Sequence, residues 1–191
     1  MNKFKILFFV ILIVFSFSSC KSVDNNVVEQ EKTTNTDSDI FAGQVTPNYQ
    51  IIGENKIALY SFNFQLPNDL SLLSNTVNPI AENSDGTFQL MIEDKTESIA
   101  DYKEYINSTY SKYKAIGMEM SEIEFISPNG LPITRFSLNT TDEENKNVTM
   151  IFYFIKQDDW KIDAVVMLKG NEVVDYSEVD NYIATIEFFE N

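Results

Sequence analysis

The sequence predicts an α+β domain in which helices flank a mainly antiparallel β-sheet, in the order β-β-α-β-β-β-β-α. Short runs of strand-forming residues follow one another across tight turns, which favours antiparallel pairing. Other stretches repeat apolar residues at helical spacing, which indicates helices before and after the main run of strands. The domain is expected over residues 51–191, after a signal over 1–19 and a linking segment over 20–50.

The N-terminal segment has the pattern of a bacterial lipoprotein signal. Lys3 and Lys5 form a short positive start, and residues 6–17 are an almost unbroken apolar run. A spanning helix needs about 20 apolar residues, so this run is too short to cross a membrane and is typical of a signal peptide. The closing Phe17-Ser18-Ser19-Cys20 resembles the bacterial lipobox, whose cysteine is acylated in the mature protein. The alternatives are an ordinary cleaved signal with an incidental cysteine, and an uncleaved anchor.

Lipidation at Cys20 predicts an extracytoplasmic protein held on a bacterial membrane, either the cell membrane or the outer membrane. Each buried methylene of an acyl chain such as palmitate adds about 0.8 kcal/mol of membrane affinity, so several chains hold the protein firmly. Residues 21–50 are rich in Asn, Thr, Asp and Glu without strand or helix periodicity, and we expect them to form a flexible tether. A coil of this length spans on the order of 30 Å.

The net charge narrows the range of partners. Loss of Lys3 and Lys5 with the signal reduces the 14 basic residues to 12, against 29 acidic residues, which gives a net charge of about −17. A surface this acidic repels nucleic acids, whose binding depends on Lys and Arg. It also repels anionic lipid headgroups, so we expect the domain to stand off the bilayer. The charge belongs either to a solvated surface alone or to a surface that selects cationic partners.

Strand patterns open the predicted domain, and the first helix follows them. Tyr60, Phe62, Phe64 and Leu66 alternate with polar residues in a half-buried strand that Pro67 ends, and Phe88, Leu90 and Ile92 continue after the turn Asp85-Gly86. We expect the helix to begin at a cap formed by Ser98 and Asp101 and to end at Gly117. Its apolar stripe comprises Ile99, Tyr102, Ile106, Thr109, Tyr110, Tyr113 and Ile116.

Four further strands and a closing helix complete the predicted order. The strands are expected over 118–126, 132–139, 148–155 and 160–168, with turns at 128–130, 142–147 and 157–159. The third of these strands is apolar on both faces, which predicts a central position in the sheet. The closing helix repeats apolar residues over 179–186, and Phe188 and Phe189 are expected to pack at its end.

The mature domain resembles the Mog/PsbP-like family of α/β/α sandwiches over roughly 57–190. The motifs that carry the resemblance are Phe62-x-Phe64-x-Leu66-Pro67, the Tyr-rich helix, Gly130-Leu131-Pro132, the strands from Arg135 to Leu168, and Ile186-Glu187-Phe188-Phe189. The family uses its fold as a scaffold for protein contacts, in photosystem extrinsic subunits and in a Ran-binding import factor. The resemblance therefore implies a scaffold for protein contacts, and it transfers no catalytic residue.

Several catalytic chemistries are excluded by composition. The chain has no histidine, which removes Ser-His-Asp triads and histidine metal sites. Acylation of Cys20, the single cysteine, leaves no thiol nucleophile and no disulfide. The six glycines are too scattered for a phosphate-binding loop, and Arg135 is the single arginine. We expect no cofactor, no metal site and no catalytic residue.

Aromatic residues are the main candidates for contact with a ligand or partner. Tyr102 and Tyr105 lie in the tyrosine-rich helix and either pack on the sheet or line an apolar pocket. Trp160 opens a strand just after a turn, where it either packs at the end of the sheet or, if exposed, anchors a partner. Arg135 is expected to pair with a surface acid rather than to hold a ligand. The acids at 142–144 and 158–159 are expected to serve turns, and the alternatives are a catalytic carboxylate pair or oxygen ligands for a calcium ion.

Three hypotheses for function follow. The first is a non-catalytic envelope lipoprotein whose domain mediates protein–protein interaction or assembly. The second is a small-ligand or lipid-binding lipoprotein, since the abundant Phe, Tyr and Met could line a cavity between sheet and helices. The third is a carboxylate-dependent hydrolase, which needs two facing acids in a cleft with shifted pKa values.

Overall fold

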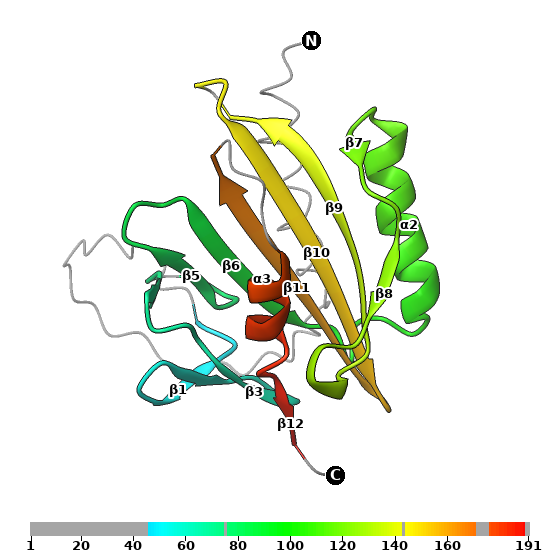
Figure 1. Cartoon of the computed structure of the whole chain (residues 1–191). Helices are drawn as coiled ribbons and strands as arrows, with labels where there is room; N and C mark the ends of the chain where they lie inside the picture. Colours follow the sequence, from blue (N-terminus) through cyan, green and yellow to red (C-terminus); the bar gives the residue numbers. More distant parts are fainter. Residues whose placement is uncertain (1–45, 75, 143, 171–175, 190–191) are drawn as a thin grey trace, which may run out of the picture. The chain divides into compact units, whose positions relative to one another are not determined.

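Two antiparallel sheets and two α-helices make up the described part of the chain in the computed structural model (Figure 1). The structure describes residues 46–74, 76–142, 144–170 and 176–189. They belong to one folded unit, Val45–Asn191. The predicted signal peptide, Cys20 and the tether up to residue 45 lie outside the described residues. Neither described helix is both long and apolar enough to cross a membrane.

The larger sheet has eight strands, in the order β4-β5-β6-β11-β10-β9-β7, with β8 also paired to β9. Strand β10 pairs with β9 on one side and with β11 on the other, which confirms the predicted central strand over 148–155. The strands are β4 (Leu70–Leu72), β5 (Ile80–Asn83), β6 (Phe88–Asp94), β7 (Glu119–Met120), β8 (Glu124–Ile126), β9 (Ile133–Thr141), β10 (Asn147–Gln157) and β11 (Trp160–Lys169).

The smaller sheet has four strands, in the order β1-β2-β3-β12. They are β1 (Gln50–Gly53), β2 (Lys56–Ala58), β3 (Phe62–Gln65) and β12 (Glu187–Phe188). In β3, Phe62 and Phe64 are buried while Asn63 and Gln65 are not, as the alternating pattern predicts. Tyr60 is not part of this strand, because it lies in a turn closed by a 2.9 Å hydrogen bond from the Leu59 amide to the Phe62 carbonyl.

The helices are α2 (Tyr102–Ala115) and α3 (Tyr176–Ile183), and a short 3-10 turn, η1, covers Pro128–Gly130. The predicted start of the first helix needs a correction. Asp101 is its N-cap, because the Asp101 carboxylate accepts a hydrogen bond from the Glu104 amide at 2.9 Å, whereas Ser98 lies in the turn before it. Gly117, with φ of 79°, ends the helix as predicted.

The two faces of the larger sheet pack against different elements. Helix α2 covers one face, where the Tyr113 ring lies 5.1 Å from the Phe152 ring. The other face is covered by α3 and the smaller sheet (Figure 1). This second face holds the main hydrophobic core, which includes Ile57, Phe62, Phe64, Leu90, Ile92, Ile151, Ile155, Val166, Val179 and Ile183. The predicted α+β class with antiparallel pairing is confirmed.

The prediction of one sheet between helices is wrong in one respect, because a second sheet shares a face with α3. Strands β1, β2 and β12 have only two to four residues each, too few for an alternating pattern to stand out. Strand β12 also pairs with β3, from the far end of the chain. The predicted strand over 118–126 is divided into β7 and β8, which both pair with β9.

Candidate functional site

Tyr60, in the turn before β3, contacts Trp160, the first residue of β11. Phe189 follows β12, and its amide donates to the carbonyl of Ser61, the residue next to Tyr60. We call these three aromatic residues the aromatic end. The Tyr60 and Trp160 rings meet edge to face with their centroids 6.2 Å apart. The exposed fraction is 67% for Tyr60 and 38% for Phe189, and Trp160 is half-buried. Single exposed aromatic residues are common, but a group that includes Trp and Tyr is typical of a contact surface.

Ser61 fixes the position of Tyr60. It is fully buried, and its amide and hydroxyl donate to Asp94 Oδ2 at 3.0 and 2.5 Å. Asp94 is the last residue of β6, so these bonds tie the Tyr60 turn to the larger sheet. The Ser61 carbonyl also accepts a 3.1 Å hydrogen bond from the Phe189 amide. The aromatic end is therefore held by strands of both sheets, which limits the entropy that a contact there would lose.

Acidic residues lie directly beside the aromatic end. Gln157 pairs with Trp160 across the turn formed by Asp158 and Asp159, and both acids are exposed. Asp158 has φ of 52°, in the left-handed region that Asp tolerates better than most residues. The predicted turn over 157–159 is confirmed, and it brings negative charge next to the indole of Trp160.

A second polar cluster lies between α2 and the larger sheet. The hydroxyls of Tyr102 and Tyr105 each lie 2.6 Å from one carboxylate oxygen of buried Asp163. Across the β11–β6 pair, Asp163 lies opposite Glu93, whose carboxylate is 2.7 Å from Lys95 Nζ. Two of the polar residues around Asp163, Tyr102 and Tyr105, belong to α2. The other two, Glu93 and Lys95, lie in β6 and directly after it. The cluster therefore joins α2 and β6 to β11.

The protonation of Asp163 follows from burial and from the number of available protons. Burial raises the pKa of Asp163 to about 6, although the two tyrosine hydroxyls and the Lys95 ammonium act in the opposite direction. The Tyr102 hydroxyl has one proton but two acceptors, since it also lies 2.5 Å from the Ile162 carbonyl oxygen. A protonated Asp163 satisfies all three groups, because it can donate to Tyr102 while Tyr102 donates to Ile162.

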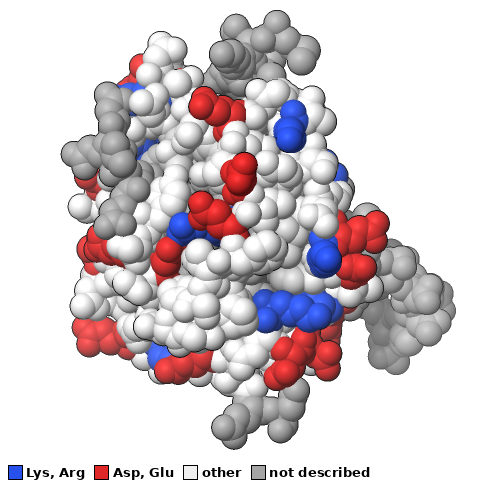
Figure 2. All heavy atoms as spheres, turned by 45° about the vertical axis from the view of Figure 1, so that its right-hand side comes forward, with Lys and Arg blue, Asp and Glu red and all other residues white. Residues whose placement is uncertain are grey.

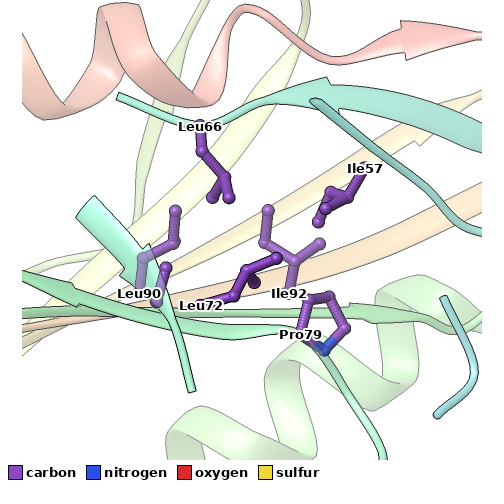
Figure 3. Close-up of a pocket in the computed structure, with 7 residues that line it drawn as sticks. Ile57, Leu66, Leu72, Pro79, Leu90 and Ile92 are labelled. Carbon is purple, nitrogen blue, oxygen red and sulfur yellow. The ribbon is translucent and has the colours of Figure 1, made fainter. Parts of the chain in front are cut away.

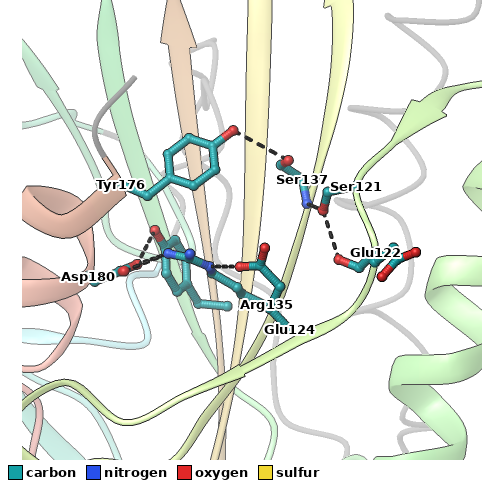
Figure 4. Close-up of polar contacts among 8 residues, drawn as sticks. Ser121, Glu122, Glu124, Arg135, Ser137, Tyr176 and Asp180 are labelled. Atoms are coloured by element: carbon teal, nitrogen blue, oxygen red, sulfur yellow. Dashed lines mark hydrogen bonds and ion pairs between the residues drawn. The ribbon is translucent and has the colours of Figure 1, made fainter. Parts of the chain in front are cut away.

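A third cluster surrounds the single arginine, between α3 and β8 (Figure 4). Arg135 Nε lies 2.7 Å from Glu124 Oε2, and Nη1 lies 2.5 Å from Asp180 Oδ2. The Tyr153 hydroxyl donates to Asp180 Oδ1 at 3.0 Å, and the guanidinium lies 5.1 Å from the centre of the Tyr176 ring. The expected pairing of Arg135 with an acid is confirmed, and the pair fastens α3 to β9.

Charge is distributed rather than gathered into one patch on the face that Figure 2 shows. Acidic residues predominate there, and the basic residues lie among them. Within residues 46–74, 76–142, 144–170 and 176–189, no group of three or more His, Cys, Asp or Glu side chains is arranged to hold a metal ion.

A narrow apolar space lies between the smaller sheet and strands β4 to β6 (Figure 3). About 140 Å³ of volume lies here outside the protein atoms, part of it open solvent, and no part of the space is wide enough for a water molecule. Its lining is aliphatic and consists of Ile57, Leu66, Leu72, Pro79, Ala81, Leu90 and Ile92. This space is a packing defect of the core and offers no room for a ligand.

The structure separates the residues that the sequence singles out. Tyr102 and Tyr105 lie against the larger sheet with their hydroxyls on Asp163, whereas Trp160 lies in the aromatic end. Cys20 lies outside the described residues. Sequence reasoning missed Tyr60 as the neighbour of Trp160, since Tyr60 continues an apparent strand alternation. It also missed the bond of Phe189 to Ser61, since Phe189 follows a helix in the sequence. The roles of Tyr102, Tyr105 and Trp160 in contact with a ligand or partner remain predictions.

No protein-family model matches the chain, and no curated protein matches it. Among solved structures, a protein from Bacteroides thetaiotaomicron VPI-5482, determined at 1.50 Å resolution, is similar with a TM-score of 0.47 and 14% sequence identity. The similarity covers 68% of this chain and 45% of that chain, so the chain spans less than half the length of that protein.

Proposed function

We propose that the chain is a lipid-anchored protein of the bacterial envelope, without catalytic activity, whose domain binds a protein partner or supports an assembly. The observation that carries this proposal is the aromatic end, where Tyr60, Trp160 and Phe189 are partly or largely exposed and are positioned by strands of both sheets. Trp and Tyr on a preorganised surface are the residues that most often dominate binding energy in protein interfaces.

The buried clusters support a structural role for the carboxylates. Asp163 and Glu93 face each other, which is the arrangement that a carboxylate-dependent hydrolase needs. However, Asp163 is only 7% exposed and accepts from two tyrosines, and Glu93 is only 8% exposed and pairs with Lys95. Groups that are buried and satisfied within the protein stabilise the fold and are not presented to a substrate. No observation favours the hydrolase or the ligand-binding alternative.

We also propose that the domain is a variant of the PsbP-like sandwich. The order of elements supports this: a tyrosine-rich helix, a meander of long strands from β9 to β11, and a closing helix α3. The variant carries an added four-stranded sheet on the face that α3 covers. In that fold family the scaffold serves protein contacts, which agrees with the proposed role.

Metabolic labelling tests the anchor. Cells that express the full chain are grown with an alkyne analogue of palmitate, and the purified protein is examined for the label. The wild-type chain should be labelled and sediment with membranes, whereas Cys20→Ser should be unlabelled and released into the soluble envelope fraction. Equal labelling of the two chains would contradict lipidation at Cys20.

Affinity purification tests the docking role. The full lipidated chain is purified from detergent-solubilised membranes after mild cross-linking, beside the Tyr60→Ala variant and beside Phe125→Ala as a matched control, since Phe125 is 83% exposed on β8. We expect a co-purifying protein with wild type and with Phe125→Ala that is depleted with Tyr60→Ala. Recovery of no protein above background would contradict the proposal.

A further inference from the structure

We infer that the aromatic end binds a segment of a partner protein that is rich in Lys and Arg. This inference rests on the proposed function and names the chemistry of the partner. The binding surface consists of the three aromatic side chains of Tyr60, Trp160 and Phe189, together with the acidic turn of Asp158 and Asp159.

Ring chemistry favours a cationic partner. The face of a Trp or Tyr ring attracts an ammonium or guanidinium group, and Trp attracts it most strongly. Tyr60 and Trp160 meet edge to face, so the two rings present differently oriented surfaces within one small area. The long methylene stems of Lys and Arg can pack on the same rings while their charged heads reach outward. One segment could therefore use both the rings and the neighbouring carboxylates.

Local charge favours the same partner. Asp158 and Asp159 precede Trp160 directly and are exposed, so their carboxylates are available to cations at the surface. The two nearest lysines, Lys156 and Lys161, pair with each other across β10 and β11, so both belong to the opposite face of the sheet from the Gln157–Trp160 pair. Lys161 Nζ donates to the Ile99 carbonyl at 2.6 Å on that opposite face. Lys56 lies 2.8 Å from Glu187, so this ion pair adds no net charge.

The acidic balance also argues against other occupants of this surface. Anionic lipid headgroups and nucleic acid phosphates would meet the carboxylates of Asp158 and Asp159 and the excess of 29 acidic over 14 basic residues in the whole chain. A basic protein segment meets attraction instead, both at long range and at the rings.

Trp160 provides a direct readout, because it is the single tryptophan of the chain. The full lipidated chain is reconstituted in phosphatidylcholine vesicles, and its tryptophan emission is followed during titration with a short Lys- and Arg-rich peptide. A Glu-rich peptide of equal length is the probe of opposite charge. We expect a saturable change in emission with the basic peptide alone, which weakens as salt is raised.

Matched variants separate this surface from general attraction to an acidic protein. Tyr60→Ala, and Asp158→Asn with Asp159→Asn, should each weaken the apparent affinity about tenfold while leaving the circular dichroism spectrum unchanged. The control is Glu119→Gln with Glu122→Gln, which removes two exposed charges beyond β9 and away from the aromatic end. The control should change the affinity less than about twofold.

Three outcomes would overturn the inference. The first is no change of emission with the basic peptide. The second is an equal loss of affinity in the control, which would indicate attraction to the whole acidic surface. The third is quenching of Trp160 by brominated phosphatidylcholine without peptide, which would indicate that the bilayer covers the aromatic end. If any of these outcomes occurs while the affinity purification still recovers a partner, the inference of a Lys- and Arg-rich partner segment is wrong. The proposed docking role is then still supported.

Discussion

On the α2 face of the larger sheet, Asp163 is held by two tyrosine hydroxyls, whereas on the α3 face Asp180 is held by Arg135 and by one tyrosine hydroxyl. Both carboxylates are largely buried, and both fasten a helix to the sheet. They differ in the cation within reach, because Lys95 is taken by Glu93 beside Asp163, while Arg135 contacts Asp180 directly. The α3 attachment is therefore ionic, and the α2 attachment becomes more favourable when its carboxyl is neutral.

The polar groups of both clusters have a structural role. In both clusters the polar atoms are satisfied by other atoms of the protein, so each cluster stabilises the fold. The aromatic end differs, since it exposes aromatic rings next to the exposed side chains of Asp158 and Asp159. The predictions below test the two attachments, from the largest expected effect to the smallest.

Removal of the arginine should have the largest effect. Arg135→Ala leaves Asp180, whose side chain is 14% exposed, without its cation, and this should lower the free energy of unfolding by about 3 kcal/mol. Urea unfolding of the full chain measures the change. The exposed pair of Lys56 and Glu187 is the control, and Lys56→Ala should cost less than about 1 kcal/mol. Similar costs for the two variants would contradict an ionic attachment of α3.

Replacement of both Arg135 and Asp180 by apolar residues tests the ionic attachment of α3 more sharply. Arg135→Met combined with Asp180→Leu removes the buried charges together, and the double variant should recover most of the stability that Arg135→Ala loses. The same urea unfolding measures it. A double variant as unstable as the single one would mean that packing of the arginine stem, and not the unpaired carboxylate, accounts for the loss.

The attachment of α2 should become weaker as pH rises, because of the carboxyl of Asp163. Its folded-state pKa of about 6 lies above the ordinary 3.8, so the folded protein binds more protons between these values, and its contribution to stability falls as pH rises through them. Asp163→Asn keeps the shape, and its amide can donate to Tyr102. Relative to wild type, the variant should gain about 2–3 kcal/mol between pH 4 and pH 7.

Urea unfolding of both chains at several pH values measures this difference, in which the effects of the other acidic groups cancel. A stability difference that stays constant between pH 4 and pH 7 would show that Asp163 titrates at its ordinary pKa.

Removal of one tyrosine hydroxyl at a time from the Asp163 cluster should have an intermediate effect on stability. Tyr102→Phe and Tyr105→Phe each remove one hydrogen-bond donor from Asp163 and should each lower the free energy of unfolding by about 1–2 kcal/mol at pH 7. Both hydroxyls hold the pKa of Asp163 down, so each variant should raise it further. The loss should therefore be smaller at pH 4.5, and a loss that is larger at pH 4.5 would contradict this assignment.

The helix cap should have the smallest effect. Asp101→Ala removes the acceptor of the Glu104 amide and should cost about 1 kcal/mol. Ser98→Ala alters the residue that the sequence also suggested as a cap, and should cost less than half as much. Thermal unfolding by circular dichroism distinguishes them, and the reverse order would place the helix start before Asp101.

Long, regular elements could be predicted from the sequence because each carries its own pattern. Residues 148–155 are apolar on both faces, which is enough to place β10 at the centre of a sheet, and the spacing from Tyr102 to Tyr113 is enough to place α2. The smaller sheet could not be predicted in this way. Glu187 and Phe188 become a strand only because they pair with Asn63 and Phe62, across most of the domain.

The candidate site was predictable only in part, for the same reason. Trp160 was identifiable because it follows a turn at the start of a strand, but its neighbours depend on tertiary contacts. Tyr60 reaches it through the buried bonds of Ser61 with Asp94, and nothing near Tyr60 in the sequence signals them. Likewise the pairing of Tyr102 with Asp163 depends on how α2 docks on β11.

Photo-cross-linking from the aromatic end tests the central claim most directly. A photoreactive phenylalanine analogue replaces Tyr60 in the full lipidated chain, and in a second chain it replaces Ile116, which is 49% exposed at the end of α2. The account predicts a discrete heavier product from position 60 in intact cells and none from position 116. Absence of a product from position 60, or the same product from both positions, would contradict docking through the aromatic end.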